Sequence, residues 1–157
     1  MSPAHLHLAI VHVPVVLCPL ATVLLIVAMV RGKAGDPHAQ LGWVLLIVAA
    51  IASLVAYYSG PPAFEQLQGS RTNIQDLVED HAVLGRAAFV GMVLLGVLAI
   101  QGLLRFAQDE SPARWLRTTI LILAMALCYL LAWSAHLGGQ ISHPEIRGSS
   151  FLFPRLE

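Results

Sequence analysis

This sequence has few charged side chains. Asp, Glu, Lys and Arg make up 11% of its 157 residues, whereas a soluble domain carries about 25%. The nine basic and nine acidic residues cancel to a formal net charge of zero, so the composition does not suggest a basic surface that would bind nucleic acid. Hydrophobic residues account for 57% of the chain, which places it in the membrane class.

Cysteine is rare in this sequence, with two residues. Cys18 and Cys128 both lie inside apolar stretches, where a free cysteine usually behaves as a small hydrophobe. The chain has no Cys-x-x-Cys motif, which argues against a covalently attached c-type heme and against a cysteine-clamped zinc site. Gly-rich phosphate motifs are missing too, and no nucleophile–base–acid arrangement stands out. A non-catalytic subunit is therefore favoured over an enzyme.

Four long apolar runs occupy residues 8–30, 41–58, 87–104 and 118–135. Each approaches the ~20 residues that a helix needs to cross the hydrocarbon core, and backbone groups in lipid must be satisfied within a helix. We predict an all-α integral membrane protein, an antiparallel four-helix transmembrane bundle in one domain, 1–157. The expected helices are 8–30, 41–58, 82–104 and 116–137, with a connection at 61–80 that begins where Gly60-Pro61-Pro62 stops the second helix, and a short tail at 144–157.

The distribution of basic residues predicts the orientation. Five of the nine lie in the first and third loops, and most of the acidic residues lie on the other side of the membrane. By the positive-inside rule, both termini and the 61–80 connection face the periplasm of a bacterial inner membrane. The first run is long and has no basic segment before it, so we expect it to be a retained helix rather than a cleaved signal peptide.

Histidines gather at one edge of the predicted bundle. In an up-down-up-down arrangement the outer ends of the four helices lie together. Six of the seven histidines lie at those ends: His5, His7, His12, His81, His136 and His143. Imidazole binds iron, copper and zinc, and ionisable residues in membrane spans usually mark function. The clustering predicts a metal or heme centre.

Helical spacing divides these histidines into layers. His5 and His12 are seven residues apart and share a face, about 10.5 Å apart along the axis, whereas His7 points about 140° away. We therefore interpret His7, like His38 in the first loop, as a residue bonded to backbone or water. His12 and His136 are expected to form a deeper layer. The predicted metal ligands are His12, His81, His136 and His143, with His5 as a further candidate.

Residues near these histidines suit a flat macrocycle. Small residues leave space for it, an aromatic residue on the stripe of His136 packs on its face, and arginines pair with its propionates. The alternative interpretation is that the glycines let membrane helices pack closely and that the aromatic residue is a filler. The predicted cofactor-binding set beyond the histidines is Gly85, Gly138, Gly139, Trp133, Arg86 and Arg147.

The donor set favours b-type heme. Histidines on different helices of a bundle suit bis-histidine ligation, and the mobile outer positions make one heme the expectation and two the alternative. Copper or zinc remains an alternative, with Glu79, Asp80 or Glu145 as additional ligands.

Three short motifs resemble a bacterial family of small, largely uncharacterised four-helix membrane proteins. They are His5-Leu6-His7-Leu8-Ala9-Ile10-Val11-His12-Val13-Pro14, Asp80-His81-Ala82-Val83-Leu84-Gly85 and His136-Leu137-Gly138-Gly139-Gln140-Ile141-Ser142-His143. Members of that family open with a His-Pro…Val-His-Phe-Pro-like motif. Here Val13 stands in place of the Phe, and no proline follows His5. The resemblance implies a cytochrome b-like protein with a heme-linked role in electron transfer.

The resulting expectation is a heme b-binding subunit embedded in the lipid bilayer. It would transfer electrons between a periplasmic redox partner, such as a cytochrome, and quinone or the other subunits of a redox complex. The acidic segment 65–80 offers a docking surface for a basic cytochrome. Two alternatives stay open: a cofactor-free structural or assembly subunit whose histidines bond to nearby acids, and a copper- or zinc-binding membrane protein.

Overall fold

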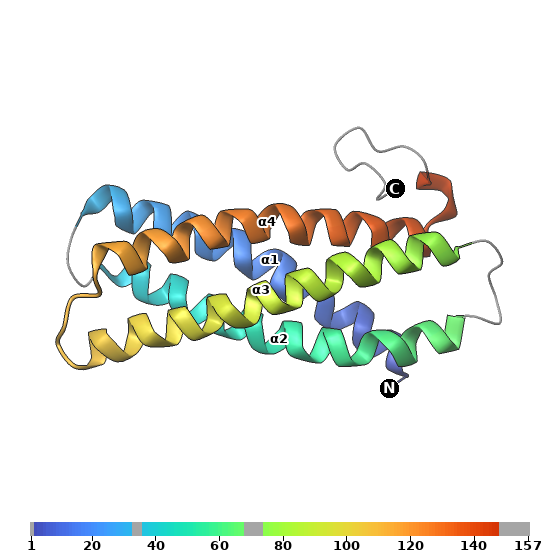
Figure 1. Ribbon diagram of the computed structural model, residues 1–157, viewed down its shortest axis with the longest axis horizontal. Coiled ribbons are helices and arrows are strands. Elements are labelled where there is room, and N and C mark those ends of the chain that lie inside the picture. The colour runs from blue at the N-terminus through green and yellow to red at the C-terminus, as the bar shows by residue number, and fades with distance from the viewer. Residues whose placement is uncertain (1, 33–35, 68–73, 148–157) are drawn as a thin grey trace.

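The computed structural model describes residues 2–32, 36–67 and 74–147, and these residues form an all-α bundle. The four long helices are α1 (Pro3–Arg31), α2 (Pro37–Leu67), α3 (Gln75–Ala107) and α4 (Arg114–Ser142), followed by the short 3-10 helix η1 (Pro144–Ile146). Successive helices run in opposite directions (Figure 1). The described ranges contain no β-strand. The predicted antiparallel four-helix bundle is confirmed.

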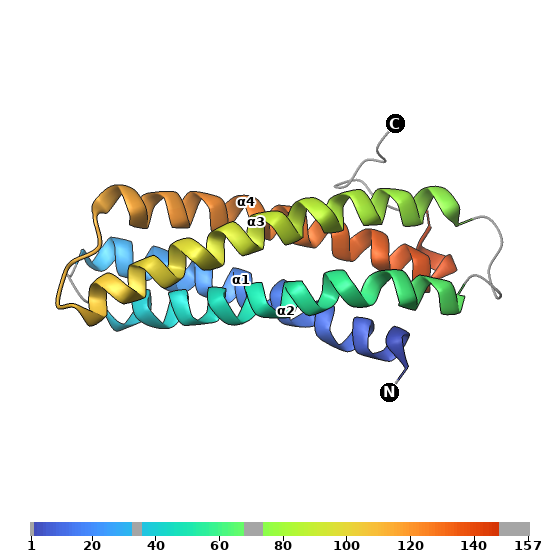
Figure 2. The ribbon, with the colours of Figure 1, turned by 60° about the horizontal axis from the view of Figure 1, so that its bottom comes forward.

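The helices form a ring in which each contacts its two neighbours. α1 packs on α2, α2 on α3, α3 on α4, and α4 closes the ring on α1, an arrangement that can be followed in Figure 2. α1 and α3 therefore lie on one diagonal, and α2 and α4 on the other. Side chains that point inward from diagonal helices can meet only on the axis of the bundle.

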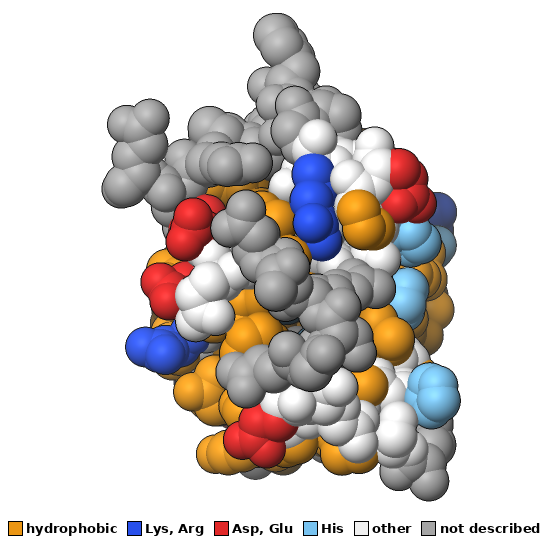
Figure 3. Space-filling model, turned by 90° about the vertical axis from the view of Figure 1, so that its right-hand side faces the viewer, with side chains coloured by type: hydrophobic (Ala, Val, Ile, Leu, Met, Phe, Trp, Pro, Cys, Tyr) orange, Lys and Arg blue, Asp and Glu red, His pale blue; other side chains and the backbone are white. Residues whose placement is uncertain are grey.

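The bundle has two chemically distinct ends. The histidine end comprises residues 3–12, 56–67, 75–85 and 134–143, and the arginine end comprises residues 25–31, 36–43 and 102–117. The start of α1 and the end of α4 both lie at the histidine end (Figure 1). Viewed directly, this end shows histidine side chains surfacing together along one edge (Figure 3).

All four helices are long and apolar enough to cross a membrane. They contain between 29 and 33 residues, which at 1.5 Å per residue is about 45 Å. Because the hydrocarbon core is only ~30 Å thick, the helix ends extend to the level of the lipid headgroups. The exposed side chains along the spans are mostly apolar, such as Val16, Ile51 and Val97, as contact with lipid requires.

Local chemistry explains where α1 begins and ends. The Ser2 hydroxyl accepts a hydrogen bond from the backbone N–H of His5, and Pro3 occupies the first position of the helix, where no N–H is needed. At the other end Gly32 has φ +64°, and its N–H donates to the carbonyl of Ala28. This left-handed conformation favours glycine and closes the helix.

The four helices are longer than the sequence analysis predicted. The prediction that Gly60-Pro61-Pro62 stops the second helix is wrong, because α2 continues to Leu67. Proline in a membrane helix is tolerated where neighbouring helices and local adjustments satisfy the freed backbone groups. The predicted connection at 61–80 is also largely helical, since α3 begins at Gln75.

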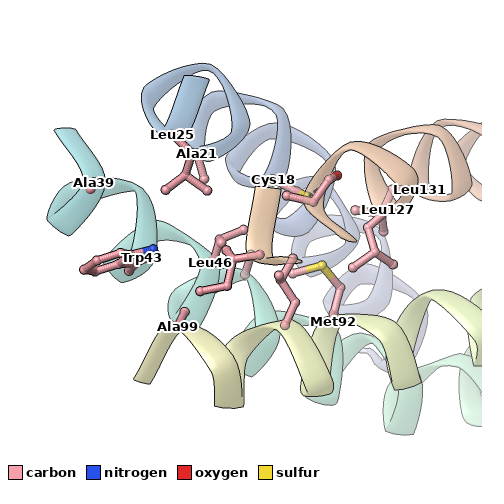
Figure 4. Packing of buried hydrophobic residues seen from close by; sticks show 14 of the residues in the cluster. Cys18, Ala21, Leu25, Ala39, Trp43, Leu46, Met92, Ala99, Leu127 and Leu131 are labelled. Carbon is pink, nitrogen blue, oxygen red and sulfur yellow. Dashed lines mark hydrogen bonds between the residues drawn. The ribbon is translucent and has the colours of Figure 1, made fainter. Parts of the chain in front are cut away.

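Small residues bring the helices together in the core. Leu46, Met92, Leu95 and Ile120 are fully buried among alanines from all four helices, and part of this packing is seen in Figure 4. A Cβ on Gly96 would lie 2.7 Å from the Cβ of Ala50, so glycine is required for α2 and α3 to approach this closely. A second, smaller cluster packs at the histidine end around Ile74, Leu77, Leu84, Leu137 and Ile141.

Candidate functional site

Two histidines from diagonal helices meet inside the histidine end. His7 of α1 and His81 of α3 have ring centroids 6.5 Å apart and ring planes 89° apart. Both side chains are half-buried. Because α1 and α3 do not pack directly on each other, the two imidazoles bridge the interior of the ring. They form the candidate site, which we call the histidine pair.

Each member of the histidine pair is held by the helix that follows its own. The Nδ1 of His7 lies 3.0 Å from the carbonyl oxygen of Ala56 and 3.1 Å from the Oγ of Ser59 in α2. The Nδ1 of His81 lies 3.0 Å from the carbonyl oxygen of Ser134 and 3.5 Å from its Oγ in α4. The two helical hairpins therefore repeat the same contact, with a carbonyl and a serine hydroxyl beside each ring.

These contacts define the proton positions on the rings. A backbone carbonyl can only accept, so Nδ1 of each histidine must be the donor. In the neutral imidazole the other ring nitrogen, Nε2, then keeps its lone pair. The histidine pair thus offers two imidazoles in the tautomer that binds metals through Nε2.

Glycines make room for both rings. A Cβ built on Gly60 would lie 3.4 Å from the Cε1 of His7, and one on Gly138 would lie 3.2 Å from the Cε1 of His81. A larger side chain at either position would press on the imidazole. Gly138 was predicted as a site residue, and its role in the structure is to seat His81.

His12 does not belong to the interior. Its ring is exposed, and its Nδ1 lies 2.6 Å from the carbonyl oxygen of Leu8 on its own helix. The structure places His12 on an exposed face of α1, and the expectation that it shares a deeper layer along the helix axes with His136 stays a prediction. The predicted angle of about 140° between His7 and the His5/His12 stripe holds, but the face that turns inward is that of His7.

The remaining predicted histidine ligands lie outside the pair. His136 is half-buried, and its Nε2 lies 2.8 Å from the amide nitrogen of Gln140. His5 and His143 are exposed; the Nδ1 of His5 lies 3.1 Å from Ser2 Oγ, and the Nδ1 of His143 lies 3.1 Å from Glu145 Oε1. The predicted outer layer of His5 and His143 is therefore engaged in short-range contacts within its own segments.

Of the other predicted site residues, one packs against a neighbouring element, one caps a helix, and two do neither. Gly139 packs against η1, since an added Cβ would lie 3.5 Å from Ile146 Cδ1, whereas Gly85 has open space around it. Arg147 donates from Nε to the carbonyl of Gln140 at 2.9 Å, so it caps the end of α4. Arg86 is exposed.

Trp133 has an indole N–H that is buried and has no hydrogen-bond partner within the described ranges. Leaving a buried donor without an acceptor costs free energy of folding. Its neighbour Ser134 supplies the carbonyl that holds His81. The unpartnered donor therefore lies next in sequence to the anchor of the histidine pair.

Acidic residues contribute little to the interior of this end. Glu145 is exposed, and its pKa lies below the usual range because of a backbone hydrogen bond and the nearby His143 and Arg147. Within the described part of the chain, no group of three or more His, Cys, Asp or Glu side chains is arranged to hold a metal ion. Cys18 and Cys128, with their sulfurs 3.8 Å apart, pack in the core.

The arrangement defines a four-helix membrane-spanning protein with two inward-facing imidazoles at one end. A family model described as "Predicted membrane protein (DUF2231)" matches residues 3–145. The match covers most of the chain, so the chain belongs to this family. No curated protein and no solved structure matches the chain. The expected membership of a family of small membrane proteins is thereby supported.

Proposed function

We propose that the histidine pair is the axial ligand set of one b-type heme and that the protein is an electron-transfer subunit of a membrane complex. One observation carries this proposal. Both imidazoles donate Nδ1–H to a backbone carbonyl, which leaves both Nε2 lone pairs for a metal. Their centroids are 6.5 Å apart, and two imidazoles bound on opposite sides of one metal at ~2 Å per bond have centres about 6 Å apart.

The number of donors favours heme over the other metals. A structural zinc site takes four protein ligands and a catalytic one takes three, whereas the macrocycle of a heme supplies the equatorial ligands itself and needs only axial ones from the protein. Inside the histidine end, His7 and His81 form a pair, and the described residues contain no three-residue cluster. A two-ligand site suits heme better than zinc or copper.

Groups around the pair support the same proposal. A carbonyl that accepts from Nδ1–H is the usual outer partner of a metal-binding histidine, because it orients the ring and raises its basicity. Gly60 and Gly138 limit the bulk beside the rings, and the unpartnered N–H of Trp133 is a donor available to a polar edge of a ligand. A bound heme would supply one-electron chemistry; the chain's own residues would orient the ligands and exclude water.

The proposed setting follows from the charge pattern. The histidine end would face the periplasm of a bacterial inner membrane, with both termini on that side. The arginine end, which holds Arg31, Arg105, Arg114 and Arg117, would face the cytoplasm. Electrons would pass between a periplasmic partner and quinone or a larger complex.

A cofactor-free structural subunit is the second candidate, and one observation favours it. Each imidazole of the histidine pair already bonds to the next helix, so the pair could act as a clamp that ties α1 to α2 and α3 to α4. In a cofactor-free subunit, His7 and His81 would stabilise the bundle and would bind no metal.

A visible spectrum of the purified full-length protein separates the two candidates. We expect a Soret band that shifts on dithionite reduction, with low-spin features that are lost in His7→Ala and in His81→Ala. His12→Ala and His38→Ala are the controls, because both replace a histidine outside the pair. A protein without a Soret band and without bound copper or zinc would favour the clamp. Loss of heme in His12→Ala or His136→Ala, with His7→Ala unaffected, would contradict the histidine pair as the ligand set. It would favour the ligands predicted from the sequence instead.

A further inference from the structure

A pocket at the arginine end is built by all four helices. It lies between the last turns of α1, the first turns of α2, the last turn of α3 and the start of α4. Its lining includes apolar residues such as Leu25, Met29 and Phe106. The polar lining consists of Asp36, Gln40, Trp43, Ser111 and Arg117.

Two donors of this pocket have no acceptor. The indole Nε1 of Trp43 and the guanidinium Nε of Arg117 are buried and have no hydrogen-bond partner among the described residues. Trp43 is 2% exposed and lies on α2 close to Ala39 (Figure 4). Arg117 also takes part in none of the ion pairs formed there. A buried donor, and above all a cationic one, is costly unless it is paired.

Acids near the pocket are already engaged. Asp36, whose side chain is 1% exposed, binds Arg31 Nε at 2.9 Å and His38 Nδ1 at 2.6 Å, and it also accepts from the backbone N–H of His38 at 2.9 Å. Glu110 pairs with Arg105 at 3.0 Å. Arg117 therefore has no acidic partner among the described residues, and the indole N–H of Trp43 is a second donor without an acceptor in the lining of the same pocket.

The position of the pocket identifies the class of anion. It lies at the ends of the apolar spans, which extend to the headgroup level of the bilayer. We propose that the pocket binds the phosphate group of an anionic phospholipid. Arg117 and Trp43 donate to the phosphate oxygens, and the first acyl carbons lie against the apolar residues of the lining. Phosphate suits Arg because charge-assisted hydrogen bonds to it are strong, and basic pockets between membrane helices are known to take anionic headgroups.

Native mass spectrometry of the delipidated full-length protein in a non-ionic detergent tests this proposal. We expect one retained molecule of short-chain phosphatidylglycerol and weaker retention of phosphatidylcholine, whose choline cation competes for the phosphate. Inorganic phosphate in excess should not displace the phosphatidylglycerol. Equal retention of both lipids would overturn the assignment to an anionic lipid. Displacement by inorganic phosphate would overturn the lipid source and indicate a free-phosphate site.

A charge-matched pair of variants locates the binding. Arg117→Gln removes the unpaired guanidinium, and Arg114→Gln removes the same charge from an exposed position on the same helix. We expect phosphatidylglycerol to bind about 10-fold more weakly to Arg117→Gln and as in wild type to Arg114→Gln. Equal weakening in both variants would reduce the effect to general surface charge and overturn the site.

Trp43→Phe removes the second donor while keeping an aromatic ring. It should also weaken phosphatidylglycerol binding, by less than Arg117→Gln because its N–H carries no charge. Its thermal midpoint without lipid, measured in parallel, reports any loss of folding. A folded Trp43→Phe protein with unchanged affinity would contradict the role of the indole.

Discussion

The two ends of this bundle pair most of their polar side chains differently, although the described residues near the histidine pair also include one buried donor without a partner, the indole N–H of Trp133. At the histidine end, His7 and His81 each find a backbone carbonyl and a hydroxyl on the next helix. At the arginine end, Asp36 has several partners, while Arg117 and Trp43 each keep a buried donor without one.

The comparison separates two ways of preparing a site. A carbonyl that accepts from Nδ1–H orients the ring and leaves the lone pair of Nε2 free to donate to a metal. An unpartnered guanidinium or indole presents a donor to an anion. The histidine end therefore suits a cation, and the arginine end suits an anion.

Orientation gives an all-or-none result. If the arginine end is cytoplasmic, as five of nine basic residues in the first and third loops suggest, a cysteine added after Glu157 should react with an impermeant reagent in spheroplasts. The same addition in a protein with Cys18→Ala and Cys128→Ala controls for the native thiols. Labelling only after lysis would place the histidine end in the cytoplasm.

Bulk beside His81 should have the next largest effect. Gly138→Leu places atoms where the imidazole lies, because even a Cβ there is 3.2 Å from His81 Cε1. Overpacking of this kind costs about 1–3 kcal/mol, and it should also loosen the bond between His81 and Ser134. Chemical denaturation in detergent measures the cost. Gly85→Leu, at a position with open space, is the matched control, and equal losses in both variants would contradict the role of Gly138.

The sequence was sufficient to predict the helices but not their full length. Hydropathy marks the part of a helix that meets hydrocarbon, so it located the four spans. It could not show that α2 passes through Pro61 and Pro62 to Leu67, because Gly-Pro-Pro normally ends a helix and is tolerated only where the surrounding bundle satisfies the freed backbone groups. α4 likewise extends through Gly138 and Gly139 to Ser142, where contact with His81 and Ile146 favours small residues.

The candidate ligands predicted from the sequence include His81 but not His7, although a signal for the inward orientation of His7 was present. Counting in sevens from His7 gives Pro14, Ala21 and Ala28, and all three are buried. The same count from His81 gives Ala88, Leu95 and Gly102, which are buried too. From His12 it leads to Pro19 and Ile26, which are exposed. Stripes of small residues mark helix interfaces in membranes, so the register of those stripes indicated which histidine turns inward, whereas spacing between histidines could not.

Removing the hydroxyl of Ser59 at the histidine end should lower the stability of the protein by a smaller amount. Ser59→Ala removes one partner of His7 but leaves the carbonyl of Ala56 in place. We expect a loss of about 1 kcal/mol or less in stability, together with a changed midpoint potential if heme is bound. Ser53→Ala, which removes a hydroxyl bonded only within α2, controls for the loss of the group itself. A potential that shifts equally in both variants would argue against an outer-partner role.

The smallest effect concerns pH at the arginine end. The backbone N–H of His38, the His38 ring and Arg31 hold the pKa of Asp36 at about 2. Since a free Asp titrates near ~3.9, the ionised form is favoured by folding. The resulting stability is present above about pH 4 and is lost as the pH falls towards 2. Asp36→Asn should therefore melt below wild type at pH 6, and the two thermal midpoints should converge as the pH approaches 2.

The size of this pH effect is limited by the exposure of the partners. The side chains of Arg31 and His38 are 46% and 36% exposed, so water and salt screen the ion pairs. Raising the ionic strength should narrow the difference between the two proteins at pH 6. Groups that do not contact Asp36 titrate equally in both proteins, so their contribution cancels in that difference. A gap that stays constant from pH 6 to 2 would show that Asp36 acts through packing and hydrogen bonds rather than through its charge.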